Sequence, residues 1–285
     1  MPCANECSDD GPVTPVAQSH LYAAARLSRQ LRGRRVTVCL PARDEAATVG
    51  AIVTAVRAAL VDAVALVDEV LVIDDGSVDA TAELAAAAGA RVVDSGGAGK
   101  GQAMWTGLAT ASGDVVVFCD ADITGFTPRF ITGLLGPLLC DEGVALVKGA
   151  FDRSLHGRPG EGGRVTELVA RPLLRTLFPA LAGIAQPLAG ECAGPRAVLE
   201  KLPFVAGYGV DIGLLLDVAD RHGADAVTQV DLGARAHRNR PLADLGAQAE
   251  VVLRTVLARA GLGPPVDECP PLVASAPPVT RWRRG

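Results

Sequence analysis

The sequence has 285 residues and a formal net charge of -5, with 27 basic residues. This length is sufficient for one large α/β domain, with or without an appendage. Nucleic-acid binding requires a positive face, and the chain has no Lys/Arg block, so nucleic acid is excluded as the main partner. Only Lys100, Lys148 and Lys201 are lysines, so each is more informative than an arginine in this Arg-rich chain.

The cysteines and the apolar segments indicate where the protein resides. Seven cysteines without a Cys-x-x-Cys pair favour free thiols in a reducing compartment over a disulfide framework. The acidic N-terminus has no apolar core and is unlike a signal peptide. The most apolar region, residues 61–73, contains three acidic residues, so no membrane span is expected. We therefore expect a soluble, cytoplasmic protein.

Apolar runs alternate with helical segments from residue 36 onward. The runs predict buried strands over residues 36–40, 69–73, 90–93, 115–118, 144–148 and 226–230. Helices are predicted over residues 21–31, 50–60, 80–88, 102–111, 128–139 and 164–178. Two more are predicted, one that ends near residue 221 and a final one after residue 241. This alternation predicts an α/β fold with a largely parallel, Rossmann-like sheet flanked by helices. Poor order is expected from residue 261, where the chain becomes Pro-rich.

The strand predicted over residues 115–118 ends in Asp120-Ala121-Asp122. In open α/β sheets, ligands bind in the crevice beyond the carboxyl ends of the strands. Carboxylates there suit Mg²⁺ or Mn²⁺, which bridges to phosphate oxygens. Acids also follow the first two predicted strands, at residues 44–45 and 74–75, so three acidic strand ends are expected to share one crevice. The alternative is a pair of loop acids, one of which caps the next helix.

A glycine-rich turn over residues 94–101 opens the helix predicted from residue 102. The free N–H groups of a helix start favour an anion. The turn is not a Walker P-loop, because Lys100 is followed by Gly101 rather than by Ser or Thr. The alternative is a flexible loop with a solvated lysine.

The second half of the chain offers three further candidate groups. Arg164 and Thr166 at a helix start are suited to a phosphate or carboxylate, although Thr166 is equally suited to plain capping. Asp211 is the one acid at an otherwise apolar helix start, where a dipole-stabilised cap is the alternative. Residues 235–240 form the densest basic cluster, in which His237 suits a metal and the arginines suit phosphates; a solvated basic turn is the alternative.

These motifs carry a resemblance to a known family. Residues 40–45, 74–77 and 120–122 resemble the nucleotide-sugar-binding signatures of GT-A fold glycosyltransferases. The later stretches narrow the resemblance to the bacterial glucosyl-3-phosphoglycerate synthases, from about residue 36 to about residue 261. Those stretches are residues 99–101, 163–172, 207–210 and 237–241.

The resemblance implies a function and a domain organisation. The function is a retaining transfer of glucose from a nucleoside-diphosphate sugar, with UDP-glucose favoured, to the 2-hydroxyl of 3-phosphoglycerate. It depends on Mg²⁺ or Mn²⁺ and is carried out by a homodimer; the apolar segments have already argued against a membrane. Within the N-terminal arm (1–33) and the Pro-rich tail (261–285) that the residues themselves indicate, the resemblance implies a nucleotide-sugar-binding part (34–151) and a smaller acceptor-binding and catalytic part (152–260).

The resemblance also assigns roles to individual residues. The implied metal ligands are Asp122 and His237. The implied catalytic residues are Asp211, Lys100 and Arg235. The implied donor-binding residues are Pro41, Ala42, Glu45, Asp75, Lys100, Asp120, Ala121 and Asp122. The implied acceptor-binding residues are Gly163, Arg164, Thr166 and Asn239.

Physical chemistry agrees with these roles. A diphosphate leaving group gains negative charge as the glycosidic bond breaks, so nearby cations stabilise the transition state more than the ground state. Retention ordinarily indicates a carboxylate nucleophile, and the chain offers no secure one. We therefore expect a same-face attack, with the leaving phosphate helping to deprotonate the acceptor.

Three features depart from the family pattern. Asp211 stands where the family has Glu, Asp75 replaces a usual Ser, and the loop before Lys100 is much shorter. The second interpretation is therefore a specialised relative with another sugar nucleotide or another phosphorylated or carboxylated acceptor.

Other protein classes fit the sequence less well. A sugar nucleotidyltransferase would have a Gly-rich loop with Arg and Lys near its first strand, which residues 41–45 do not provide. A non-catalytic binder would lack the metal ligands or His237, all of which the chain has.

Overall fold

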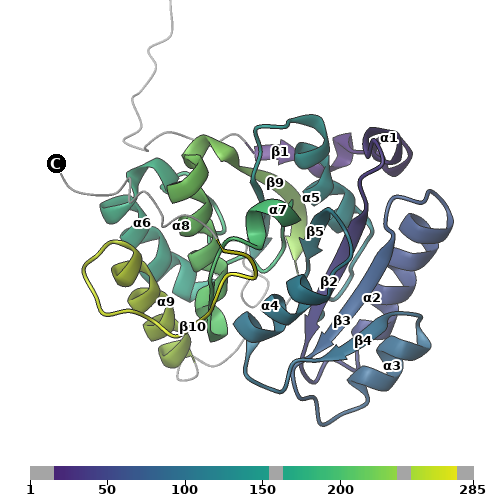
Figure 1. Cartoon of the computed structure of the whole chain (residues 1–285), viewed down its shortest axis with the longest axis horizontal. Helices are drawn as coiled ribbons and strands as arrows, with labels where there is room; N and C mark the ends of the chain where they lie inside the picture. The colour runs from purple at the N-terminus through teal and green to yellow at the C-terminus, as the bar shows by residue number, and fades with distance from the viewer. Residues whose placement is uncertain (1–15, 154–162, 236–244, 275–285) are drawn as a thin grey trace, which may run out of the picture.

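The protein is described by a computed structural model over residues 16–153, 163–235 and 245–274 (Figure 1). Its strands are β1 (Val16–Gln18), β2 (Val36–Ala42), β3 (Glu69–Asp74), β4 (Arg91–Asp94), β5 (Val115–Phe118), β6 (Leu146–Arg153), β7 (Cys192–Pro195), β8 (Phe204–Val205), β9 (Val227–Arg235) and β10 (Glu268–Cys269). Its α-helices are α1 (Ala24–Gln30), α2 (Val49–Val56), α3 (Thr81–Ala87), α4 (Lys100–Thr110), α5 (Arg129–Cys140), α6 (Arg171–Leu177), α7 (Arg196–Leu199), α8 (Val210–His222) and α9 (Leu245–Arg259). Shorter helical segments are η1 (Ser19–Leu21), η2 (Arg57–Asp62), η3 (Thr166–Ala170), η4 (Pro179–Leu181), η5 (Gly207–Gly209) and η6 (Ala224–Ala226).

Eight of these strands form one sheet in the order β1-β9-β6-β7-β5-β2-β3-β4. The half made by β5, β2, β3 and β4 is parallel throughout, and β9 is parallel to both β1 and β6. The predicted largely parallel sheet is therefore confirmed.

Strand β7 is the exception, because it lies antiparallel between β5 and β6. No apolar run in the sequence predicted this strand. Its four residues include Gly194 and Pro195, so they carry little strand propensity. Their extended conformation comes from pairing on both sides, which is a long-range effect.

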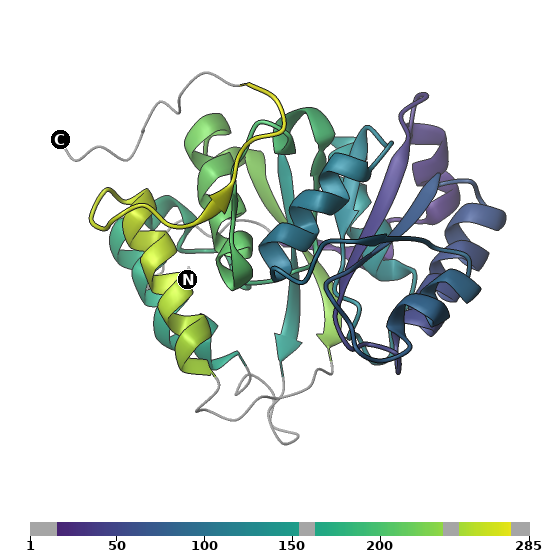
Figure 2. The same cartoon turned by 60° about the horizontal axis from the view of Figure 1, so that its bottom comes forward.

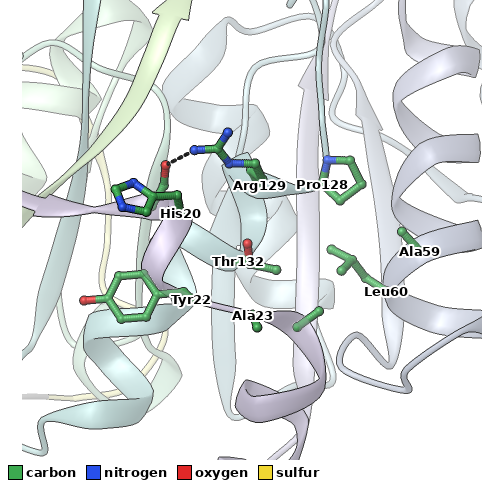
Figure 3. A pocket seen from close by; sticks show the side chains of 10 residues that line it. His20, Tyr22, Ala23, Ala59, Leu60, Pro128, Arg129 and Thr132 are labelled. Carbon is green, nitrogen blue, oxygen red and sulfur yellow. Dashed lines mark hydrogen bonds between the residues drawn. The ribbon is translucent and has the colours of Figure 1, made fainter.

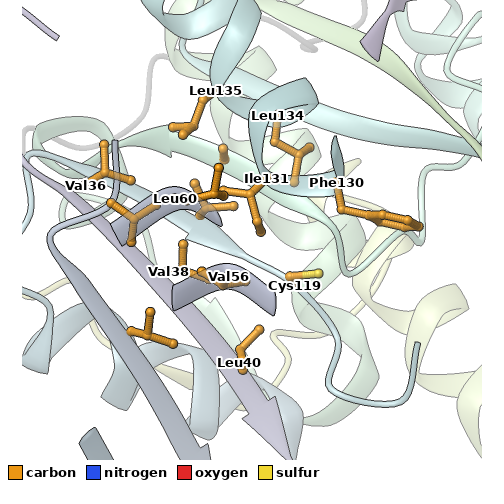
Figure 4. Packing of buried hydrophobic residues seen from close by; sticks show 14 of the residues in the cluster. Val36, Val38, Leu40, Val56, Leu60, Cys119, Phe130, Ile131, Leu134 and Leu135 are labelled. Carbon is orange, nitrogen blue, oxygen red and sulfur yellow. The ribbon is translucent and has the colours of Figure 1, made fainter. Parts of the chain in front are cut away.

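Helices cover both faces of the sheet, and each face has its own hydrophobic cluster. Figures 1 and 2 show α2 and α3 beside the β2–β4 half, and α6, α8 and α9 beside the other half. On one face, Val36, Val38 and Leu40 of β2 pack with Val56 and with residues of α5 (Figure 4). Central strands are buried on both faces, which explains their continuous apolar runs. Within the described ranges, no helix is long and apolar enough to cross a membrane.

The expectation of poor order from residue 261 is wrong for residues 261–274. Strand β10 pairs antiparallel with β8. Trp105 Nε1 of α4 donates a hydrogen bond to Pro270 O at 2.8 Å, and Val273 N donates to Glu200 O at 3.1 Å. Proline cannot continue a helix, but it is tolerated in an extended edge segment. This segment therefore packs on α4, whose first residue is Lys100.

We predict that Gly101→Ala destabilises the fold, because α4 meets β8 closely at this residue. A Cβ atom at Gly101 would collide with the carbonyl oxygen of Val205. We expect the free energy of unfolding to fall by about 1–3 kcal/mol, the usual effect of overpacking, measured by urea denaturation. Gly246→Ala is the control, because nothing lies within 4 Å of its added Cβ. Equal stability of the two variants would contradict this packing.

Candidate active site

The carboxyl ends of β2, β3 and β5 meet at one edge of the sheet. Asp75 N donates a hydrogen bond to Ala42 O at 2.8 Å, which joins the ends of β3 and β2. Thr48 Oγ1 donates to Ala121 O at 2.6 Å, which joins the segment after β2 to the segment after β5. The structure therefore brings together the three acidic strand ends that the sequence placed in one crevice. Pro41 and Ala42 are the last two residues of β2.

The loop after β2 is fixed against the loop after β3. Asp44 has a positive φ of 56°, a conformation that Asp tolerates better than most residues. Its backbone N–H donates to Ser77 Oγ at 3.0 Å, and its Oδ1 accepts from Val78 N at 2.8 Å. Glu45 N donates to Thr81 Oγ1 at 2.8 Å. The segment that carries Glu45 is thus held before any ligand arrives.

Asp75 holds the glycine-rich turn that precedes α4. Its side chain is 7% exposed, and Oδ1 accepts from Ser95 Oγ at 3.0 Å and from Gly99 N at 3.1 Å. Oδ2 lies 4.0 Å from Arg43 Nη1. Asp75 therefore orders the backbone just before Lys100, and its predicted contact with the donor remains a prediction.

Lys100 joins two carboxylates from different parts of the chain. Its Nζ lies 3.0 Å from Asp120 Oδ1, after β5, and 3.0 Å from Asp211 Oδ2, in the first turn of α8. The side chains of Lys100, Asp120 and Asp211 are 16%, 22% and 4% exposed. The alternative of a solvated lysine is therefore wrong.

The electrostatics of this group follow from burial. Burial alone would lower the pKa of Lys100, but Asp120 and Asp211 outweigh it and keep the pKa above its ordinary value. Burial raises the pKa of Asp211, and Lys100 and Lys148 act in the opposite direction. The result is a charged lysine between two carboxylates, one of them almost inaccessible to water.

Gly190 forms the backbone wall beside this group. A Cβ atom at Gly190 would collide with Asp120 Oδ1 and with Lys100 Nζ. The adjacent Glu191 is fully buried, and its charge also acts on Lys100. Gly190, Glu191 and Lys148 were not among the site residues predicted from the sequence. Lys148 could have been singled out by its rarity, because it is one of only three lysines in the chain.

Three of the four predicted acceptor residues, Gly163, Arg164 and Thr166, lie around the start of η3. Gly163 has a positive φ of 74°, and Arg164 is half-buried. Thr166 is 1% exposed, and its Oγ1 has no hydrogen-bond partner in the described part of the chain. A buried hydroxyl of this kind is available to a ligand oxygen. His237, Asn239 and the side chain of Arg235 lie outside what the structure describes.

The donor set at the strand ends fits a hard divalent cation. Asp122 is a half-buried carboxylate next to the buried Ala121, and Asp120 lies beside Lys100. Mg²⁺ is commonly held by one or two protein carboxylates together with substrate phosphates. Residues 16–153, 163–235 and 245–274 contain no cluster of three potential metal-binding side chains. His237, the other predicted ligand, is outside these ranges.

A separate pocket of about 430 Å³ lies between η1, η2 and α5 (Figure 3). His20, Tyr22 and Arg129 line it, and Arg129 Nη2 donates a hydrogen bond to Ser19 Oγ at 3.4 Å. Among the described residues that line this pocket, none is a predicted site residue and none carries a carboxylate. We therefore assign the site to the carboxyl edge, as expected for an open α/β sheet.

Comparisons with known proteins agree with this assignment. Residues 37–197 match the model of glycosyl transferase family 2. The glucosyl-3-phosphoglycerate synthase of Mycolicibacterium paratuberculosis is 49% identical over 257 residues, covering 85% of this chain and 77% of that protein.

Two crystal structures of glucosyl-3-phosphoglycerate synthase from Mycobacterium tuberculosis are also similar. One contains Mn²⁺, UDP-glucose and phosphoglyceric acid, with a TM-score of 0.80 and 44% identity over 88% of this chain and 94% of that one. The other contains Mn²⁺, UDP and glucosyl-3-phosphoglycerate, with a TM-score of 0.81 and 44% identity over 88% of this chain and 95% of that one.

The fold and the site define a glycosyltransferase of the GT-A class. The resemblance found in the sequence is confirmed. The chain belongs to the glucosyl-3-phosphoglycerate synthase family, within glycosyl transferase family 2.

We predict that Lys100→Met destabilises the protein in a pH-dependent way. The change leaves Asp211 buried without its closest cation, and breaking a buried pair costs about 3 kcal/mol. Because the carboxyl pKa is already raised, protonation at low pH removes the unpaired charge. The loss should therefore be larger at about pH 8 than at about pH 5, as measured by urea denaturation.

Lys201→Met is the control for this prediction, because Lys201 is an exposed lysine after α7. We expect its effect to stay within about 0.5 kcal/mol at both pH values. A Lys100→Met loss that is independent of pH would mean that Asp211 is not the group left unpaired.

Proposed function

We propose that the protein transfers glucose from UDP-glucose to the 2-hydroxyl of 3-phosphoglycerate, with retention at the anomeric carbon and with Mn²⁺ or Mg²⁺. The observation that carries the proposal is Lys100 held between Asp120 and Asp211 at the carboxyl edge of the sheet. Similar proteins whose structures contain UDP-glucose, phosphoglyceric acid and the glucosylated product support this choice of substrates.

The donor contacts are assigned to the strand ends. The nucleotide lies against the loop after β2, which the loop after β3 holds in place. Pro41 and Ala42 at the end of β2 and Glu45 in this loop are the assigned contacts. Asp75, Asp120 and Ala121 complete the donor site, and Asp122 with His237 holds the metal. When bound, the cation offsets negative charge on the diphosphate.

Lys100 stabilises the leaving diphosphate in this mechanism. The phosphate oxygens gain negative charge as the glycosidic bond breaks, and an already positioned ammonium then acts more strongly on the transition state than on the ground state. Its low exposure strengthens this effect, because little water competes for the charge. Arg235 is assigned a supporting catalytic role.

The acceptor is assigned to the region around η3. Its phosphate lies near Gly163, Arg164, Thr166 and Asn239. The buried Oγ1 of Thr166, which has no hydrogen-bond partner among the described residues, and the guanidinium of Arg164 supply a hydroxyl and a positive charge for an anion. These two groups support a phosphorylated or carboxylated acceptor near η3.

Retention proceeds by same-face attack in this proposal. The acceptor hydroxyl approaches the face that the diphosphate leaves, and a phosphate oxygen receives its proton. Asp211 is the carboxylate to consider as a nucleophile, because the family resemblance puts it beside the reacting sugar, but its Oδ2 is engaged by Lys100 at 3.0 Å and its side chain is 4% exposed. We therefore assign Asp211 to orienting Lys100 and the sugar.

A second candidate function is transfer to a different acceptor or from a different sugar nucleotide. Two observations favour it. Asp211 has a shorter side chain than the Glu typical of the family, and only residues 95–99 separate β4 from α4. Both features border the Lys100 group, which consists of Lys100, Asp120 and Asp211, so both affect which sugar and which acceptor fit.

We also propose that the enzyme is a cytoplasmic homodimer. The described cysteines are all free thiols, which supports a reducing compartment. The homodimer is an expectation from the family resemblance.

We predict that the purified protein, given Mn²⁺, UDP-glucose and 3-phosphoglycerate, forms glucosyl-3-phosphoglycerate detectable by mass spectrometry. Asp122→Ala should lower kcat/KM by about 100-fold or more, because the transition-state charge is less well stabilised. Glu142→Ala is the control, since its side chain is 91% exposed in the segment after α5. UDP release without this product would favour the second candidate function.

We predict that Asp211→Asn lowers kcat by about 100-fold and leaves the affinity for UDP and Mn²⁺ nearly unchanged. The amide keeps the size of the side chain and removes the charge that orients Lys100. Mass spectrometry of the wild-type enzyme during turnover should find no glucose attached to Asp211. A covalent glucosyl group on this residue would replace the same-face mechanism with a double displacement.

A further inference from the structure

Lys148 lies in β6 and is 1% exposed. A buried ammonium is unfavourable unless hydrogen bonds and opposite charges satisfy it. Lys148 Nζ donates to the carbonyl oxygen of Ala189 at 2.6 Å and to the carbonyl oxygen of Asp211 at 3.5 Å. The two carbonyls belong to segments that are distant in sequence, so Lys148 joins the stretch before β7 to the start of α8.

The stretch before β7 needs such support because it is irregular and buried. Residues 187–194 are all buried, and buried backbone groups require hydrogen-bond partners. Strand β6 supplies two of them. Besides the Lys148 bond, Gly149 N donates to Glu191 O at 2.8 Å. On the next strand, Gln229 Nε2 donates to Gly183 O at 3.0 Å and its Oε1 accepts from Ala185 N at 2.6 Å.

Both segments that Lys148 holds reach the Lys100 group. Gly190, next to Ala189, is so close to Asp120 and Lys100 that a Cβ atom would collide with both. Asp211 Oδ2 is 3.0 Å from Lys100 Nζ. A shift of either segment would therefore move the Gly190 backbone beside Lys100 or move Asp211, the ion-pair partner of Lys100.

The charges around Lys148 support the same view. Lys148, Asp211, Lys100 and Glu191 all act electrostatically on the Cys192 thiol, and Cys192 is the register partner of Lys148 between β7 and β6. Each of these four charged groups is thus within electrostatic range of the same buried thiol. Lys148 also acts on Asp211, so this carboxylate has a second cation besides Lys100.

We propose that Lys148 is a positioning residue for glucosyl transfer, which fixes the backbone at Ala189 and Asp211 and thereby sets the geometry of Lys100 with its two carboxylates. The inference rests on the proposed function and adds a residue to it. Lys148 acts through Lys100 and Asp211 and does not itself touch substrate. Misplacement of reacting groups by about 1 Å lowers turnover by about 100-fold.

The test compares Lys148→Met with a matched variant, Leu146→Ala. Leu146 lies two residues earlier in β6 and is fully buried in the cluster on the same face, but it donates no hydrogen bond to either carbonyl. For each protein, three quantities are measured: Tm, the Kd for UDP in the presence of Mn²⁺ by calorimetry, and kcat with UDP-glucose and 3-phosphoglycerate.

We expect Lys148→Met to lower kcat by about 100-fold while its Kd for UDP stays within about threefold, because the nucleotide loop after β2 is held independently. Leu146→Ala should lower Tm at least as much and leave kcat within about threefold. Lys148→Gln, which keeps an N–H donor for Ala189 O, should recover part of the lost kcat.

Three outcomes would overturn the inference. One is a Lys148→Met enzyme with wild-type kcat, and another is an equal loss of kcat in Leu146→Ala. The third is failure of both Lys148 variants to fold, because Lys148 would then serve folding alone. A wild-type protein that makes no glucosylated phosphoglycerate would instead refute the proposed function, and this first measurement separates the two failures.

Discussion

The contact of Lys100 Nζ with Asp120 and Asp211 is the interaction on which the site depends. It joins the start of α4, the end of β5 and the start of α8, which are separate in sequence and meet only in the folded sheet. Each charge is acceptable in a buried position because the others are present. The region therefore behaves as a unit, in which one cation fixes the start of α4, the segment after β5 and the start of α8 relative to one another.

Much of the first half was predictable because its signals are local. Continuous apolar runs identified β2, β3 and β5, and acids directly after them identified the edge where they meet. Lys100 was found because a glycine-rich turn precedes it. The fold class followed from the alternation of strands and helices, since parallel neighbours require crossovers.

The features that could not be predicted from the sequence depend on contacts between residues that are distant along the chain. Strand β7 has no strand-like composition, and β10 lies in a Pro-rich segment that needs β8 as a partner. Lys148 was placed in a strand, but nothing in its neighbours indicates that its ammonium reaches two carbonyls from other segments. Sequence pattern shows which face a residue occupies, whereas hydrogen-bond partners across the sheet are set by topology.

The position of β7 has a consequence for how the chain folds during synthesis. Strand β5 is the inner strand of the first half of the sheet, and its partner on the other side is β7, at residues 192–195. Until that segment leaves the ribosome, the nascent chain exposes β5 as an unpaired apolar edge. Such edges favour intermolecular pairing. The emerging first half is therefore the stage at which a chaperone would most reduce aggregation.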